Sequence, residues 1–257
     1  MGALVANFYG FAVDGFLLAT FCSAIGFVGN IGVPKSIDSG TPAPLAEALA
    51  LDIGLLALFA LQHSLMARRW FKDAWTRVVP RAAERSTYVL AASVVLAALL
   101  WQWRPLAEPV IWRVQSPLGV AMLWLVFCLG WGVLLLSTFL INHFDLFGLR
   151  QAFAGADAPA ARFRTPFLYR YVRHPIYLGF VLGFWAAPVM TAGHLLFAAG
   201  ATGYIVLGIA FEERDLIAQF GDEYRRYRER VGMLLPRLLR AGNKTLPERN
   251  RPAAPRA

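Results

Sequence analysis

The sequence predicts an all-α integral membrane protein with about five to six transmembrane helices, the last two arranged as a helical hairpin. Three observations support this fold class. Of the 257 residues, 58% are hydrophobic and only 16% are charged, a balance too apolar for an ordinary soluble domain. Apolar stretches close to the length of a membrane-spanning helix recur along the chain. The basic residues gather in alternate connections between these stretches, as they do in multi-pass membrane proteins.

Six apolar segments are expected to form the membrane helices. The first lacks a basic leading region and a small-residue cleavage site, so it is interpreted as a span and not as a signal peptide. The fifth and sixth are short for a hydrocarbon core that takes about 20 helical residues, and a turn around Gly193 joins them just after Pro188. We therefore expect a tight hairpin that is tilted or does not fully cross. The segments cover residues 8–29, 45–66, 86–103, 118–141, 176–190 and 193–211.

The basic residues predict the orientation in the membrane. All but three of the 25 Lys and Arg residues lie in 67–85, in 142–175 or after residue 212. Because basic residues concentrate in cytoplasmic connections, these parts and the N-terminus are expected in the cytoplasm, with 31–44 and 104–117 outside. The net charge of +9 is then explained by topology, and no nucleic-acid partner is expected.

The chain is expected to be organised in five consecutive parts. Residues 67–85 carry aromatic side chains at near-helical spacing among basic ones, which is typical of an amphipathic helix at a membrane surface. The final residues are polar and rich in proline, which is typical of disorder. The parts are 1–66 with the first two spans, 67–85 as a cytoplasmic amphipathic helix, 86–153 with spans three and four, 154–236 as a cofactor-binding hairpin with a cytoplasmic helix, and 237–257 as a disordered tail.

Charged residues stand directly against two of the apolar segments. The stretch YVRHPIYLGF places Arg173 and His174 at the start of the fifth segment, and the pair Glu212–Glu213 directly follows the sixth. A solvated pair at the membrane exit is the simple interpretation of the two glutamates. At the depth of the membrane surface, however, a carboxylate pair needs partners, which arginines or the polar groups of a ligand can supply.

Three of the four histidines are expected at one level of the membrane. His63 and His143 end the second and fourth segments, at the same cytoplasmic side as His174, whereas His194 lies at the opposite tip of the hairpin. Any one of them could simply anchor its helix at the interface. Ionisable groups that face the interior of a bundle are nevertheless candidates for function.

Several other classes of protein are excluded or disfavoured by the motifs. The two cysteines, Cys22 and Cys128, form no disulfide framework and no zinc-type spacing, and no metal site is predicted. The phosphate-binding glycine loops and the common hydrolase motifs are absent. Gly179 and Gly183 form a GxxxG pattern, which favours close packing of the fifth segment on another helix.

The motif RHPIYLG, followed by EERDL and FGDEYRRYRERV, resembles the membrane methyltransferases related to isoprenylcysteine carboxyl methyltransferase and phospholipid N-methyltransferases. The resemblance covers roughly residues 165–236. It implies S-adenosylmethionine as cofactor, bound at the cytoplasmic membrane face between the charged turn and the acidic pair. The residues carried over to cofactor binding are His174, Pro175, Tyr177 and Glu212, with Glu213, Tyr169 and Arg173 as further contacts.

The rest of the chain narrows the resemblance. The stretches ALQHSLMARRWFKDAW and LLLSTFLINHFDLFGLRQ resemble the bacterial membrane thiol S-methyltransferases that convert methanethiol to dimethyl sulfide, and this likeness spans most of 55–236. It implies a small volatile thiol as acceptor, a lipid bilayer as surroundings and the bacterial inner membrane as location. Because a thiolate is a better nucleophile than a thiol, a histidine base is expected. The candidates are His143 and His63, with Asp145 able to orient an imidazole.

Two alternatives remain at this stage. The same stretches resemble the wider NnrU group, which includes a haem-containing isomerase, and in that case His63 and His143 would be haem ligands. The paired charged motifs argue against it, since a haem protein would not need them. A lipid or prenyl acceptor is the second alternative. The isoprenylcysteine enzymes place a carboxylate-binding arginine one helical turn before the acidic pair. In this sequence Gly208 occupies that position, which argues against an acceptor that carries a carboxylate.

Overall fold

The computed structural model describes residues 3–141, 163 and 165–237. Within these residues, the fold class is confirmed, because five helices are long and apolar enough to cross a membrane. Each coincides with a strongly apolar part of the sequence. They are α1 (Ala3–Gly29), α2 (Leu45–Ala67), α4 (Arg81–Gln102), α5 (Pro117–Ile141) and α9 (Ala192–Phe220).

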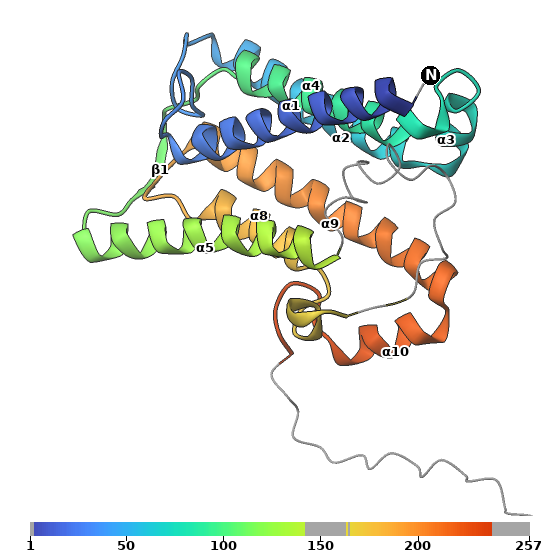
Figure 1. The fold of residues 1–257 in the computed structure, drawn as a ribbon. Helices are drawn as coiled ribbons and strands as arrows, with labels where there is room; N and C mark the ends of the chain where they lie inside the picture. Colours follow the sequence, from blue (N-terminus) through green and yellow to red (C-terminus); the bar gives the residue numbers. More distant parts are fainter. Residues whose placement is uncertain (1–2, 142–162, 164, 238–257) are drawn as a thin grey trace, which may run out of the picture.

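The helices pack as two groups with α9 between them. In one group, α1 and α2 both pack on α4, and in the other α5 packs along the short α8 (Pro175–Trp185). Figure 1 shows α9 running between the groups, where it contacts α2 on one side and α8 on the other. A core of large side chains, among them Phe27, Trp103, Phe197 and Trp131, fills the space between the groups.

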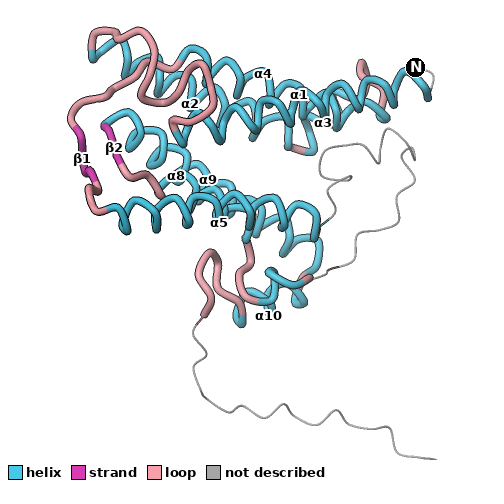
Figure 2. The backbone as a smooth tube through the Cα atoms, turned by 60° about the vertical axis from the view of Figure 1, so that its left-hand side comes forward, coloured by secondary structure: helices cyan, strands magenta, loops and turns pink. Residues whose placement is uncertain are grey.

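The connections gather at the two ends of the bundle, as the distribution of basic residues predicts. The α1–α2 loop and the connection from α4 to α5 lie at one end, where β1 (Val110–Arg113) pairs antiparallel with β2 (Val189–Thr191) (Figure 2). The basic turn with α3 (Arg69–Trp75) lies at the other end (Figure 1). Prolines mark several helix starts, since Pro44 and Pro80 precede the first turns of α2 and α4.

The predicted hairpin exists, but its two arms differ in length. α8 has 11 residues, about 16 Å of helix, which is too short to cross a hydrocarbon core of about 30 Å. α9 has 29 residues and continues well past the predicted end at residue 211. The apolar segment ends at residue 211 as predicted, but the helix continues because residues 212–220, five of which are charged or polar, contain no glycine or proline. The helix ends only at Gly221, whose φ of 56° suits glycine.

Two further details differ from the predictions. The β1–β2 ribbon was not predicted, because runs of three and four residues are too short to show a periodic pattern. The amphipathic helix expected over 67–85 is only the seven-residue α3, and α4 already begins at Arg81, directly after Pro80. Most of the predicted tail 237–257 and the start of the part 154–236 lie outside the described residues.

A glycine seam brings α5 and α8 into backbone contact. A Cβ on Gly179 would lie 2.6 Å from the Gly130 carbonyl oxygen, and one on Gly130 would lie 2.8 Å from the backbone nitrogen of Gly183. The predicted role of this GxxxG pattern in helix packing is therefore supported by its contacts. The seam sets the position of α8, and the charged residues Arg173 and His174 directly precede its first turn.

We expect Gly179→Ala to destabilise the protein by about 1–3 kcal/mol, because the added methyl group meets backbone that cannot move aside. The matched control is Gly132→Ala on α5, where a Cβ meets nothing within 4 Å and alanine should be neutral or slightly stabilising. Thermal unfolding in detergent measures both. Equal melting temperatures for the two variants would contradict the close packing.

Candidate active site

The charged turn, which contains Arg173 and His174, is fixed by backbone hydrogen bonds to the segment that follows α10 (Asp222–Arg230). After the short 3-10 helix η1 (Phe167–Arg170), the backbone N–H groups of Arg173 and His174 donate to the carbonyls of Gly232 and Met233, at 2.8 and 3.1 Å. Pro175 then occupies the first position of α8 and is buried, which suits a residue with no N–H to leave unpaired. Both charged side chains therefore start from a fixed backbone.

Glu213 is the centre of the charged cluster. Its Oε1 accepts hydrogen bonds from Arg173 Nε at 2.7 Å and from His174 Nε2 at 3.1 Å, and its Oε2 lies 3.7 Å from Arg228 Nη1. The side chain is only 11% exposed. A carboxylate at this depth is tolerated because cations and donors surround it, so Glu213 joins α9 to the turn before α8.

Arg173 is mostly occupied within the protein. Besides Glu213, it donates through Nη1 to the carbonyls of Arg228 at 3.0 Å and Val231 at 2.5 Å. A guanidinium has five N–H donors, so three of them hold the protein together. Its main part in the site is to position the turn, and only the remaining donors are left for a ligand.

Glu212, one residue earlier, is placed differently. Its side chain is 44% exposed, and its Oε2 lies 3.6 Å from His174 Nδ1. His174 therefore stands between two carboxylates, with Glu213 at one ring nitrogen and Glu212 at the other. Of the acidic pair, Glu213 is committed to the fold and Glu212 is available to a ligand.

A cavity of about 320 Å³ opens in front of this cluster, in the size range of small-molecule sites. It is enclosed by the end of α5, by η1, by the charged turn, by the last turns of α9, and by α10. Four residues of the predicted cofactor site line it together with aromatic and aliphatic side chains: Tyr169, Arg173, His174 and Glu212, with Leu140, Phe163, Pro166, Leu216, Phe220, Tyr224 and Tyr227.

Two tyrosine hydroxyls in this cavity have unused hydrogen-bonding capacity. Those of Tyr169 and Tyr224 are buried and have no protein partner among the described residues. Burial raises the pKa of both phenols, helped by the charges of Glu212 and Glu213 respectively. Burial also raises the pKa of Tyr227 to about 12, and its hydroxyl donates to the Tyr169 carbonyl at 2.5 Å. The phenols therefore stay protonated at physiological pH, and those of Tyr169 and Tyr224 offer donors to a ligand.

His63 belongs to a neighbouring aromatic group that does not line this cavity. The Tyr88 hydroxyl lies 2.9 Å from its Nε2 and 3.1 Å from its Nδ1, Phe59 stacks on the ring and Tyr204 meets it edge-on. Tyr177 lies between the two groups. Its ring centroid is 5.7 Å from that of His174. Its hydroxyl donates a hydrogen bond to the Glu212 carboxylate and also interacts electrostatically with Tyr204 and Tyr88.

The predicted site residues therefore divide into four sets. Tyr169, Arg173, His174 and Glu212 meet at the cavity, while Glu213, Pro175 and Tyr177 support or adjoin it. His63 lies in the adjoining aromatic group. His143 and Asp145 lie outside the described residues.

The sequence predictions missed several of the residues around the cavity. Tyr224 and Tyr227 occupy one face of α10, and Phe163 packs against both rings. Their spacing of three on an otherwise charged helix is the one signal that points to them, since such residues share a helix face. Phe163 and Phe220 carry no such signal, because isolated aromatic residues are common in membrane proteins.

Comparison with known proteins identifies the family. The chain is 55% identical to the methanethiol S-methyltransferase of Mycobacterium tuberculosis over 231 residues, which cover 89% of this chain and 94% of the relative. It is 56% identical to methanethiol S-methyltransferase 1 of Bradyrhizobium diazoefficiens over 236 residues, which cover 90% of this chain and 82% of the relative. The chain belongs to the methanethiol S-methyltransferase family.

A more distant likeness extends to Nurim of Xenopus laevis, which is 33% identical over 208 residues, covering 71% of this chain and 70% of the relative. No family model matches the chain, and no solved structure matches it. The family predicted from the sequence is confirmed. The haem-binding alternative is not favoured, because the two relatives that are 55% and 56% identical over most of the chain are methyltransferases by name.

We expect Glu213→Gln to lower the free energy of unfolding by about 3 kcal/mol, because it leaves the buried Arg173 guanidinium without its counter-charge. The control is Asp222→Asn, which breaks an exposed ion pair with Arg225 at 2.9 Å and should change stability by less than about 0.5 kcal/mol. The measurement is the melting temperature of each purified variant in detergent. Equal losses in both variants would rule out a central role for Glu213.

Proposed function

We propose that this protein is a membrane S-methyltransferase that methylates methanethiol to dimethyl sulfide with S-adenosylmethionine, at the cytoplasmic face of the bacterial inner membrane. The observation that carries the proposal is the cavity between the charged turn, the acidic pair and α10. It combines an available carboxylate, two unpaired phenol donors and aromatic walls in one enclosed space. The methyltransferase relatives supply the class of reaction.

The residues around the cavity fit S-adenosylmethionine. When bound, this cofactor supplies an electrophilic methyl group on a sulfonium sulfur. The Glu212 carboxylate can accept from an amino group or from ribose hydroxyls, and the hydroxyls of Tyr169 and Tyr224 can donate to a carboxylate. The faces of the aromatic rings suit a cation. The buried hydroxyls without partners are the main sign of fit, because buried polar groups otherwise find partners in the protein.

The supporting residues hold these groups in place. Glu213 fixes His174 and Arg173, and Arg173 in turn fixes the ends of α10 and of the segment after it. Methyl transfer is a displacement in line with the attacking sulfur, so accurate positioning is most of what the protein has to supply. For accurate positioning, the carboxylate, ammonium and sulfonium groups of S-adenosylmethionine each need a fixed partner in the protein.

The acceptor is proposed to be a small thiol without a carboxylate. At Gly208, one turn before Glu212, a side chain would meet nothing within 4 Å, so a longer residue fits sterically but is not there. The thiol must lose its proton before attack, and an imidazole nitrogen of His143 is proposed to accept it, with Asp145 orienting the ring. His63 is the second candidate, although Tyr88 already lies against both of its ring nitrogens.

The direct test is incubation of the purified protein with methyl-labelled S-adenosylmethionine and a panel of acceptors. We expect labelled dimethyl sulfide in the headspace with methanethiol, and no product with a prenylcysteine or a phospholipid. Product from either lipid-like acceptor, with none from methanethiol, would replace the proposed acceptor. Heat-inactivated protein is the control for uncatalysed methylation.

The cofactor site is tested by Glu212→Gln and His174→Ala. Each should weaken S-adenosylmethionine binding at least tenfold, because one removes an accepting charge at the cavity and the other removes the group that orients that charge. Glu47→Gln, at the first turn of α2 at the other end of the bundle, is the matched control and should bind normally. Calorimetry on folded protein measures all three, and unchanged affinity in both site variants would move the site elsewhere.

The base is tested by the pH dependence of His143→Ala. A positioned base contributes about 10²–10⁴-fold, so kcat/KM for methanethiol should fall strongly at pH 6.5. At pH 9 more thiolate is already present, so the loss should be smaller. A loss that stays constant over this range, with cofactor binding intact, would reject proton transfer and leave His143 a positioning residue. His63→Ala, measured in parallel, shows whether the second candidate behaves in the same way.

A further inference from the structure

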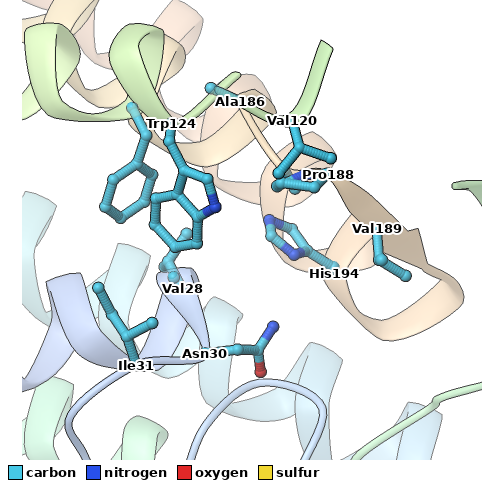
Figure 3. A pocket seen from close by; sticks show the side chains of 12 residues that line it. Val28, Asn30, Ile31, Val120, Trp124, Ala186, Pro188, Val189 and His194 are labelled. Atoms are coloured by element: carbon cyan, nitrogen blue, oxygen red, sulfur yellow. The ribbon is translucent and has the colours of Figure 1, made fainter. Parts of the chain in front are cut away.

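A second cavity, of about 250 Å³, lies at the opposite end of the α8–α9 hairpin from the candidate active site. It forms where α8 ends and α9 begins, against the end of α1 and the first turns of α5. Figure 3 shows the imidazole of His194 projecting into it, with Trp124 and Val28 across the space. The hairpin thus carries one cavity at each of its ends.

His194 is only 1% exposed, and the hydrogen bonds around it define what it can offer. Its backbone N–H donates to Thr191 Oγ1 at 3.1 Å, and its ring Nε2 lies 2.9 Å from the Phe184 carbonyl oxygen. A carbonyl only accepts, so Nε2 carries the proton. In the neutral ring, Nδ1 is then a bare acceptor, and it has no partner among the described residues.

The rest of the cavity offers little other polarity. Asn30, at the rim, uses both ends of its amide on Asp38, donating at 2.8 Å and accepting from its backbone N–H at 3.3 Å. The other side chains around the cavity are aliphatic, aromatic or proline, and among them the Trp124 indole N–H is a donor that accepts no hydrogen bond. An unpaired buried acceptor is unfavourable, so the matching occupant has an apolar body and one hydrogen-bond donor.

We propose that this cavity is a second binding site, which takes a small alkanethiol with its S–H group donated to His194 Nδ1. The choice of a thiol among small donors rests on the proposed function. A water molecule takes about 30 Å³ of liquid volume, so the cavity has room for more than the two heavy atoms of methanethiol. Longer alkanethiols therefore bind more tightly, by roughly fourfold for each added methylene.

The test uses the full chain in detergent with ¹⁵N-labelled histidine, and the probes are ethanethiol, butanethiol and diethyl sulfide. The His194 signal is assigned with His194→Gln, whose amide N–H can still donate to the Phe184 carbonyl. We expect the Nδ1 resonance to move saturably with both thiols, with butanethiol about 15-fold tighter, and to stay in place with the sulfide. No movement up to the solubility limit of butanethiol would mean that the cavity holds water only and would overturn the proposal. An equal shift with the sulfide would overturn the hydrogen bond on which it depends.

A variant that fills the cavity shows whether the shift of the His194 Nδ1 resonance comes from a thiol bound there. Val120→Trp, on the first turn of α5, should abolish the thiol-dependent shift, whereas Leu118→Trp on the same turn, 73% exposed and outside the lining, should leave it intact. A shift that persists in Val120→Trp places the thiol elsewhere and overturns the assignment. Methyl transfer measured on the same wild-type preparation separates the two proposals, because turnover without a shift rejects this site alone. A shift without turnover supports this site and rejects the proposed activity.

Discussion

The geometry of the candidate active site depends on one buried carboxylate. Glu213 sits near the end of a 29-residue helix and holds the side chains that begin an 11-residue helix. Without the Glu213 carboxylate, the Arg173 guanidinium would be a buried charge with no counter-charge, which is costly. Without Arg173, the buried carboxylate would carry the same cost. Each therefore requires the other, and together they fix α10 through the carbonyls of Arg228 and Val231. The neighbouring Glu212, which lies beside His174 and Tyr177, keeps part of its carboxylate exposed to the cavity because Glu213 carries this structural role.

A second constraint acts from the apolar side. α8 is too short to cross a bilayer, so its place is set by its contacts, and the glycine seam with α5 brings the two backbones together. Small residues are the usual means of close helix approach in a membrane, where burial of apolar surface gives no drive for association. The ion cluster holds the start of this short helix, and the seam holds its side against α5. Between them they fix where His174 lies relative to the cavity.

The two ends of the α8–α9 hairpin differ in the kind of polar groups that they bury. At one end, charges are concentrated, paired and surrounded by phenols that keep their protons. At the other, His194 faces an apolar space, and one of its ring nitrogens has no partner in the part of the chain that the structure describes. A methyl acceptor that is both small and apolar suits a protein of this kind. Such an acceptor partitions into the bilayer and can reach either end of the hairpin without crossing an aqueous phase.

The sequence by itself determined the class of fold and the family, and it predicted four of the residues that line the candidate site. Apolar length decides what can span a membrane, and the motif around His174 and the acidic pair is local enough to be recognised in one dimension. The tertiary structure alone decided which glutamate is buried among cations and which is exposed at the cavity, since the two are adjacent and chemically identical. It also brought Tyr169 and Tyr224 together from segments more than fifty residues apart. The division of roles within the acidic pair follows from helix rotation and packing, which place one side chain against Arg173 and turn its neighbour toward the cavity.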